Sequence, residues 1–218
     1  MPEDLDKLER RVSVPSPPPV HFETLAPGIF AADLIDPEDC DNIVSEFSHD
    51  TRWVDAGITT YRGEVGMRVE NVISSRRVAQ HIRFRDLDLS MHPLLVSFLN
   101  NVRRHVLPLI ATEFGLNVRE MGEAEIVRYP LGGMFAPHSD ASVVKPYRAF
   151  SVLLYLNDEF RGGGTDFPIL GFTCEPRKGR VLVFPSLTTH AGNPVAAGSK
   201  QIIVMWIFCP GSIDEYPV

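Results

Sequence analysis

Short apolar runs dominate the second half of the sequence, and they have the composition and length of β-strands. Glycine, proline and asparagine separate them, as is typical of tight connections between strands. Within the second run, Ser151, Leu153 and Tyr155 share one face because successive strand side chains alternate. This half of the chain predicts an antiparallel sheet sandwich. The runs are 124–129 (AEIVRY), 148–157 (RAFSVLLYLN), 179–185 (GRVLVFP) and 200–209 (KQIIVMWIFC).

Apolar spacing in the first half predicts helices instead. In 36–47, Asp36 suits the N-cap and Pro37 suits the first helical position. A longer apolar stripe runs through 91–114, where Pro108 predicts a kink or the start of another helix. The polar segment 55–77 between them suits a hairpin or a mobile loop. Helices followed by strands predict an α+β fold, with the helices packed on one side of the sandwich.

The first 20 residues have a different composition from the rest of the chain. A charged start leads into VSVPSPPPV, which cannot form a helix and favours a polyproline II conformation. We therefore expect residues 1–20 to form a flexible, proline-rich arm. We expect residues 21–218 to form a single domain, which is long enough to bury a substantial core.

Charge and cysteine content restrict the partners and the compartment. The formal net charge of -7 argues against nucleic acid and anionic membranes as partners. No apolar run is long enough to span a bilayer, and the charged start does not resemble a signal peptide. The scattered cysteines Cys40, Cys174 and Cys209 fit neither a disulfide framework nor a closed zinc site. These features predict a cytoplasmic protein, either a monomer or a homodimer.

His138 and Asp140 form a His-x-Asp pair, which is a candidate metal site only in the right context. Alone the pair is weak evidence, since His21 and Glu23 have the same spacing. In an extended strand, however, residues two apart point to the same side and can bind one ion. His190, which follows the strand VLVFP, is the best candidate for a third ligand. The other histidines are expected to be surface or helix-packing residues: His49, His81, His92 and His105.

Two histidines and one carboxylate on one side of a metal leave several coordination positions open. Non-haem Fe(II) oxygenases use this arrangement, and the open positions admit a chelating cosubstrate together with O2. A zinc hydrolase is the alternative, although the helical His-Glu-x-x-His pattern is absent. Lys200 lies ten residues after His190, at the start of an apolar strand. A buried cation there would pair with the distal carboxylate of a dicarboxylate chelator.

Together these motifs resemble the Fe(II)- and 2-oxoglutarate-dependent dioxygenases, and more narrowly the prolyl 4-hydroxylase subfamily. The resemblance covers roughly residues 124–208, and it predicts a catalytic core at about 122–210. It implies a double-stranded β-helix, that is, a jelly-roll or cupin-like core of antiparallel strands with N-terminal helices on one sheet. The motifs that carry it are RYPLGGMFAPHSD, RAFSVLLYLND, GGGTDFP and the segment from Pro176 to Trp206.

The resemblance also implies roles for individual residues. His138, Asp140 and His190 would bind Fe(II) as the catalytic centre. Lys200 would pair with the C5 carboxylate of 2-oxoglutarate. The same cosubstrate would contact the hydroxyl groups of Tyr129, Tyr155 and Thr165. The implied cofactors are Fe(II), 2-oxoglutarate and O2, with ascorbate as a candidate reductant, whereas Trp206 is expected to pack beneath the site.

The implied reaction is hydroxylation of an unactivated C–H bond, with release of succinate and CO2. The expected substrate is a prolyl residue in a peptide or a related amino-acid-like compound. Arg68, Arg148 and Tyr61 are the candidate substrate contacts, because arginine suits a carboxylate or a peptide carbonyl. A biosynthetic hydroxylase of small molecules and a non-catalytic barrel that binds a metal or a ligand remain as alternatives.

Overall fold

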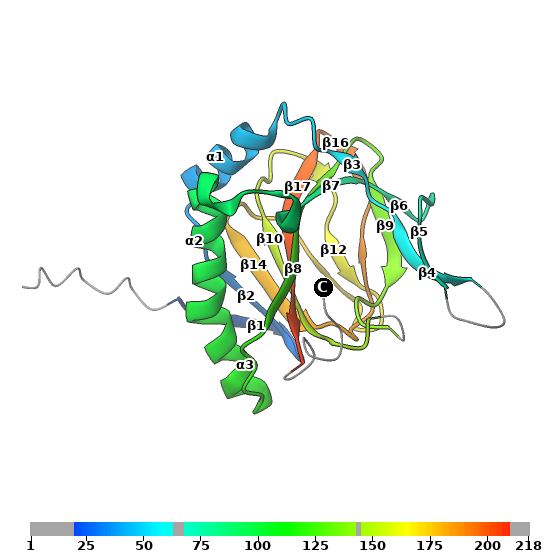
Figure 1. The fold of residues 1–218 in the computed structure, drawn as a ribbon. Helices are drawn as coiled ribbons and strands as arrows, with labels where there is room; N and C mark the ends of the chain where they lie inside the picture. The colour runs from blue at the N-terminus through cyan, green and yellow to red at the C-terminus, as the bar shows by residue number, and fades with distance from the viewer. Residues whose placement is uncertain (1–19, 63–67, 143–144, 210–218) are drawn as a thin grey trace, which may run out of the picture.

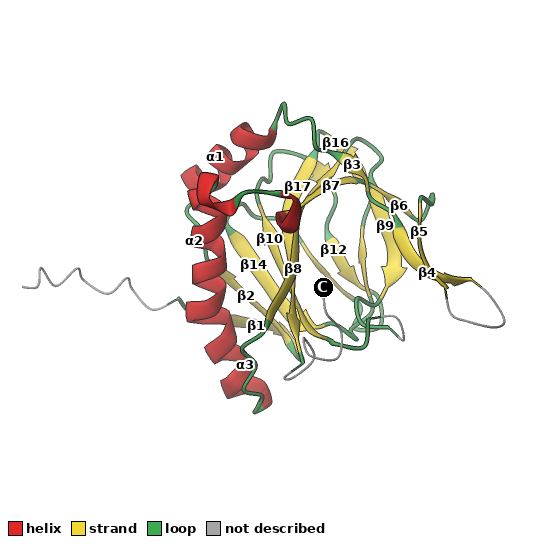
Figure 2. Cartoon of the chain, in the orientation of Figure 1, coloured by secondary structure: helices red, strands yellow, loops and turns green. Residues whose placement is uncertain are grey.

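The computed structural model describes residues 20–62, 68–142 and 145–209 (Figure 1). The expected arm, residues 1–20, lies outside these ranges except for Val20. In the described part, two antiparallel sheets face each other and the helices run along one side (Figure 2). The helical elements are α1 (Pro37–Phe47), η1 (Phe84–Asp86), η2 (Leu89–Met91), α2 (Pro93–Asn101), the π-turn η3 (Val102–Val106) and α3 (Leu107–Phe114).

The larger sheet has eight strands in the order β1-β2-β14-β10-β17-β8-β7-β3, and every neighbouring pair is antiparallel. The four apolar runs that predicted strands form its neighbouring strands β14, β10, β17 and β8. The strands are β1 (Glu23–Ala26), β2 (Ile29–Asp33), β3 (Val54–Asp55), β7 (Gln80–Arg83), β8 (Met121–Tyr129), β10 (Arg148–Tyr155), β14 (Arg180–Pro185) and β17 (Lys200–Phe208).

The smaller sheet has five strands in the order β13-β12-β15-β9-β6. Two further strand pairs, β4 with β5 and β11 with β16, complete the described strands. The β4–β5 pair confirms the hairpin expected within 55–77. The strands are β4 (Ile58–Arg62), β5 (Arg68–Val72), β6 (Arg77–Val78), β9 (Met134–His138), β11 (Arg161–Gly162), β12 (Thr165–Phe167), β13 (Phe172–Cys174), β15 (His190–Gly192) and β16 (Val195–Ala197).

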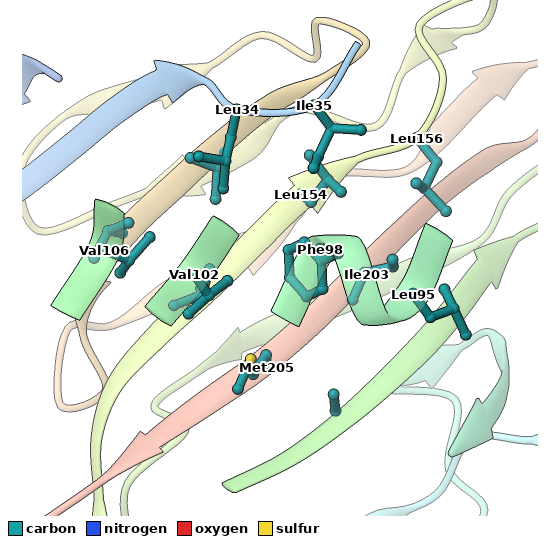
Figure 3. Packing of buried hydrophobic residues seen from close by; sticks show 14 of the residues in the cluster. Leu34, Ile35, Leu95, Phe98, Val102, Val106, Leu154, Leu156, Ile203 and Met205 are labelled. Atoms are coloured by element: carbon teal, nitrogen blue, oxygen red, sulfur yellow. The ribbon is translucent and has the colours of Figure 1, made fainter. Parts of the chain in front are cut away.

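Both faces of the large sheet are buried, which explains why its central strands are almost continuously apolar. On the outer face, Leu154, Ile203 and Met205 pack against Phe98 and Val102 of the helical layer (Figure 3). On the inner face, alternate residues of the same strands pack against the small sheet, and Tyr155 and Phe167 are part of this second core. Each fully buried apolar side chain of this size contributes roughly 1.5–3 kcal/mol. The helices therefore stabilise the sheet from behind, and the inner face is left for the site.

Local sequence signals fix the ends of the helices. The Asp36 side chain accepts a hydrogen bond from the Glu38 N–H at 2.9 Å and caps α1, as expected. Pro108 has no N–H to continue a regular helix, and the chain passes through η3 before α3 begins. Gly115 ends α3 at φ 66°, a left-handed conformation that glycine adopts without strain. None of the helices in the described ranges is long and apolar enough to cross a bilayer.

Candidate functional site

Strand pairing brings the three candidate metal ligands together in the small sheet. His138 ends β9 and lies directly opposite His190, the first residue of β15. Asp140 follows two residues after His138, and its N–H donates to the Ser186 carbonyl at 2.9 Å. One potential ligand atom from each of the three residues lies within 4.8 Å of the others. Residues far apart in sequence thus form one compact His-Asp-His cluster.

Backbone contacts determine which ring nitrogens face the centre of this cluster. Nδ1 of His138 lies 2.9 Å from the Ala136 carbonyl, and Nδ1 of His190 lies 3.0 Å from the Thr188 carbonyl. A carbonyl oxygen only accepts, so Nδ1 carries the proton in both rings. In the neutral form of each ring Nε2 then holds the lone pair, and it lies 3.5–3.6 Å from an oxygen of Asp140. Acceptor atoms that converge without a donor suit a cation, and this donor set matches a facial triad for Fe(II).

Two serines hold the carboxylate of Asp140 in place. Ser151 donates to Asp140 Oδ2 at 2.6 Å, and its hydroxyl lies 2.9 Å from that of Ser186. Burial raises the pKa of Asp140, but His190, His138 and Arg148 outweigh it and hold the pKa well below its usual range. Burial lowers the pKa of His190, although Asp140 opposes the shift. The carboxylate is therefore ionised, and His190 favours the neutral form that a metal requires.

A cavity of about 290 Å³ opens between the two sheets in front of the cluster. At its inner end lies the buried Lys200, whose Nζ donates to the Gly163 carbonyl at 2.6 Å. The ammonium lies 5.3 and 5.4 Å from the ring centroids of Tyr129 and Tyr155. No carboxylate among the described residues pairs with it, and burial lowers its pKa to about 7. A buried cation in this position suits an anionic ligand that enters from the cavity.

Hydrogen bonds organise the rest of this inner end. The hydroxyl groups of Tyr155 and Thr165 lie 2.6 Å apart. Burial raises the pKa of Tyr129, and it raises the pKa of Tyr155 well above its usual range, so both phenols stay protonated. The structure therefore brings together the four residues that the resemblance assigned to 2-oxoglutarate. We refer to Lys200, Tyr129, Tyr155 and Thr165 as the inner pocket.

The opposite end of the cavity, its mouth, is dominated by charged side chains. Glu125 is buried, and Oε2 lies 3.0 Å from Nδ1 of His81 and 3.5 Å from a terminal nitrogen of Arg77. Burial raises the pKa of Glu125, but the opposing effects of His81 and Arg77 are larger and bring the pKa down to about 2. Arg148 donates to Glu123 at 2.6 Å, and its guanidinium carbon lies 3.3 Å from the ring centroid of Trp206. The mouth is thus built from ion pairs.

The structure separates the three candidate substrate contacts. Arg148 lies on β10 and lines the cavity. The backbones of Tyr61 and Arg68 belong to the β4–β5 hairpin, whereas their side chains lie outside the described part of the structure. Trp206 also lines the cavity, so it contributes to the wall of the site and does not simply pack beneath it.

Residues that the sequence analysis did not select also line the cavity. The expectation for His81 was wrong, because this residue lies on β7, is buried and contacts Glu125. The alternation of side chains along a strand could have indicated that Glu125 faces the site. If Tyr129 points inward, Val127 and Glu125 on the same strand do so as well. Nothing in the local sequence signalled Arg77, which stacks on Phe135 at 4.9 Å from the ring centroid.

Comparison with known proteins gives three related findings. Residues 124–208 match the 2OG-Fe(II) oxygenase superfamily. Prolyl 4-hydroxylase subunit alpha-1 of Gallus gallus is 31% identical over 112 residues, which cover 43% of this chain and 22% of that protein. The viral collagen prolyl hydroxylase of Paramecium bursaria Chlorella virus-1, solved with 2-oxoglutarate, aligns at TM-score 0.61 and 18% identity, covering 84% of this chain and 96% of that one.

A third relative supports the same fold. A prolyl hydroxylase from Trichoplax adhaerens, solved with a peptide fragment of a hypoxia-inducible factor, aligns at TM-score 0.61 and 15% identity, covering 88% of each chain. The match to the Gallus gallus subunit spans about a fifth of that protein. The antiparallel fold and these matches lead to one conclusion: residues 124–208 are similar to the 2OG-Fe(II) oxygenase superfamily, and the chain resembles prolyl 4-hydroxylases in sequence over part of its length and in fold.

Proposed function

We propose that this protein is an Fe(II)- and 2-oxoglutarate-dependent dioxygenase that hydroxylates an unactivated C–H bond. The substrate class is a prolyl residue or a related amino-acid-like compound, and succinate and CO2 are the coproducts. One observation carries the proposal. Three acceptor atoms converge within 4.8 Å of one another, and they share a cavity with a buried lysine that lacks an anionic partner among the described residues.

His138, Asp140 and His190 are the proposed metal ligands. The Ala136 and Thr188 carbonyls orient the two imidazoles, and Ser151 orients the carboxylate. Such outer contacts preserve ligand geometry, and their loss typically costs ten- to hundredfold in metal affinity or activity. When bound, Fe(II) together with 2-oxoglutarate and O2 supplies the oxidising chemistry. The chain itself supplies the fixed ligands and a cavity that limits the access of water.

The inner pocket is the proposed site for the distal carboxylate of 2-oxoglutarate. Lys200 provides the charge, and the hydroxyl groups of Tyr129, Tyr155 and Thr165 provide neutral donors. Binding a carboxylate here would give the buried ammonium a counter-charge that it otherwise lacks, so the interaction is charge-assisted. Cosubstrate affinity should therefore depend on the charge of the buried Lys200.

Two experiments test this assignment. Under anaerobic conditions, Fe(II) and 2-oxoglutarate together should produce a visible charge-transfer band in the wild-type protein but not in His138→Ala. In air, the wild-type protein should release succinate, and candidate substrates should stimulate that release. A wild-type protein that gives no band and no succinate with any candidate would be a non-catalytic barrel or a hydrolase instead.

We also propose which residues contact the substrate and where in the cell the protein acts. Arg148 lines the cavity and is the best-supported substrate contact, and Tyr61 and Arg68 remain candidates on the β4–β5 hairpin. The Trichoplax adhaerens relative was solved with a peptide, whereas a free amino-acid-like compound is the other member of the proposed substrate class. A cytoplasmic location is supported by the buried thiols of Cys40 and Cys174, neither of which forms a disulfide. A fluorescent fusion viewed in intact cells checks the location.

A further inference from the structure

The mouth of the cavity carries more positive than negative charge, although the whole chain is acidic. Two carboxylates line it, and each is surrounded by basic groups. Glu125 lies near Arg77, His81 and Arg83. Glu123 lies near Arg85, Lys145 and Arg148. Even with His81 neutral, three cations remain uncompensated at the mouth, in a chain whose formal net charge is -7.

Several donors at the mouth are buried without acceptors. Nε of Arg77, Nε of Arg148 and the indole Nε1 of Trp206 have no hydrogen-bond partner among the described residues. Arg148 and Trp206 are 6% and 5% exposed, so water reaches these atoms poorly. A buried donor without a partner destabilises the folded protein. Glu125 Oε2, a buried acceptor, also has no hydrogen-bond partner among the described residues. All four residues line the cavity, so an anionic ligand that draws the two guanidinium groups toward it would supply acceptors.

The size of the cavity limits what that ligand can be. About 290 Å³ is at the lower end of the range for small-molecule sites, and this volume must hold the cosubstrate as well as the reacting part of the substrate. Arginine forks and an indole N–H suit the planar, two-oxygen geometry of a carboxylate. A residue inside a peptide presents carbonyl groups but no negative charge.

We propose that the substrate is a small carboxylic acid whose carboxylate binds Arg77 and Arg148 at the mouth, so that the enzyme acts on a free acid and not on a residue inside a peptide. This inference rests on the proposed function and specifies its substrate class. In this arrangement Glu125 positions Arg77, because it lies 3.5 Å from the guanidinium. The rings of Phe135 and Trp206 flank the two arginines and restrict their orientations.

Matched acid and amide probes test the proposal directly. Free amino acids and their N-acetyl derivatives are compared with the corresponding primary amides and with end-blocked tripeptides that contain a central proline. Binding is measured by calorimetry on anaerobic protein loaded with Fe(II) and 2-oxoglutarate, and turnover is measured as succinate release in air. At least one acid should bind about tenfold or more tightly than its amide, the size expected for a charged hydrogen bond.

Substitutions at Arg77 test whether the mouth causes the tighter binding of acids than of amides. Arg77→Gln should abolish most of the difference between acid and amide, whereas Arg77→Lys should retain part of it because the charge remains. Arg177→Gln is the matched control, since Arg177 is an exposed arginine that pairs with Asp33 away from the cavity. Thermal melting of each variant shows whether it folds, and Arg77→Lys keeps the test informative if Arg77→Gln does not.

The outcomes separate this inference from the proposed function. Equal binding of acids and amides, no binding of any acid, or a preference for the end-blocked peptides would overturn the inference. In each of these cases the anaerobic charge-transfer band with 2-oxoglutarate would still support the dioxygenase. Absence of that band would instead reject the proposed function, whatever the probes do.

Discussion

The two ends of the cavity satisfy their polar groups in opposite ways. In the inner pocket the hydroxyl groups of Tyr155 and Thr165 pair with each other, and Lys200 donates to a carbonyl but has no counter-charge within the described ranges. At the mouth two carboxylates are surrounded by a larger number of basic groups, and donors on Arg77, Arg148 and Trp206 have no acceptors among the described residues. The inner pocket needs one anionic charge, whereas the mouth needs acceptors that are arranged in space. The inner pocket therefore selects a ligand by its negative charge, whereas the mouth selects a ligand by its charge and by the positions of its oxygen atoms.

The two ends also differ in how they relate to the matched range 124–208. The inner pocket lies within the motifs that resemble the dioxygenase family. Parts of the mouth, Arg77 and His81, come from segments before the matched range 124–208. We therefore expect changes in the inner pocket to affect the use of cosubstrate, and changes at the mouth to affect the choice of substrate.

The largest effect is expected between the two ends, at the metal ligands. Asp140→Ala should remove a ligand and lower turnover by more than about a hundredfold, since losing even an outer contact costs up to that amount. Bound iron and succinate release are the measurements. Glu23→Ala is the matched control because Glu23 has the same His-x-acid spacing, but it pairs with Arg180 at an exposed site. Full activity of Asp140→Ala would reject the ligand assignment.

At the mouth, Glu125→Gln should lower the free energy of unfolding by on the order of 3 kcal/mol, because buried basic groups lose their counter-charge. Its pKa of about 2 lies below the ordinary value of 4.5, so the stabilisation is present above pH 4.5 and is lost as the pH falls toward 2. Urea unfolding across this window should therefore show a smaller pH dependence in the variant. Identical curves would mean that Glu125 does not support the mouth.

In the inner pocket, Lys200→Met should weaken 2-oxoglutarate binding by roughly ten- to hundredfold, the loss of a charged hydrogen bond of about 1.5–3 kcal/mol. Iron affinity should change little. Without cosubstrate, the same variant should melt at a higher temperature because an apolar chain replaces an uncompensated buried charge. Weaker iron binding, or no change in cosubstrate affinity, would contradict the separation of roles.

The pKa of Lys200 also predicts a pH dependence. In the folded protein it is about 7, below the ordinary 10.5, so between these values the folded state binds fewer protons than the unfolded state. Stability should therefore rise with pH through this window, and it should rise less in Lys200→Met. A dicarboxylate bound above pH 7 should bring a proton back to the lysine. Calorimetry in buffers of different ionisation enthalpy measures this uptake.

The smallest effect is expected for Thr165→Val, which removes one neutral hydrogen bond worth about 0.5–1.5 kcal/mol. The apparent KM for 2-oxoglutarate should rise a few-fold, because Tyr155 loses the partner that orients its hydroxyl. Thr173→Val is the matched control, since Thr173 donates to Asp166 at 2.7 Å and does not line the cavity. Both variants should have a lower free energy of unfolding, and only Thr165→Val should raise the apparent KM for 2-oxoglutarate.

The candidate ligand pair had a local signal, whereas the candidate residues of the inner pocket were assigned through the family resemblance. His138 and Asp140 lie two residues apart at the end of a strand, and Ser151 and Tyr155 share a face of another by period two. The fold class followed from helices that precede short strands. His81 was misjudged because a single histidine between charged residues carries no signal of the strand on which it lies.

The sequence by itself determined the chemistry of the site: two histidines, one carboxylate and one lysine at the start of an apolar strand. Only the tertiary structure decided the electrostatics of the mouth. Glu125 and Arg148 lie on β8 and β10, which both pair with β17 in the large sheet, whereas Arg77 lies on β6 of the small sheet. They converge because the two sheets face each other. Charge pairing and burial depend on distances between such residues. Local sequence therefore indicates the candidate metal ligands, whereas the strand order and the packing of the two sheets decide which side chains surround them.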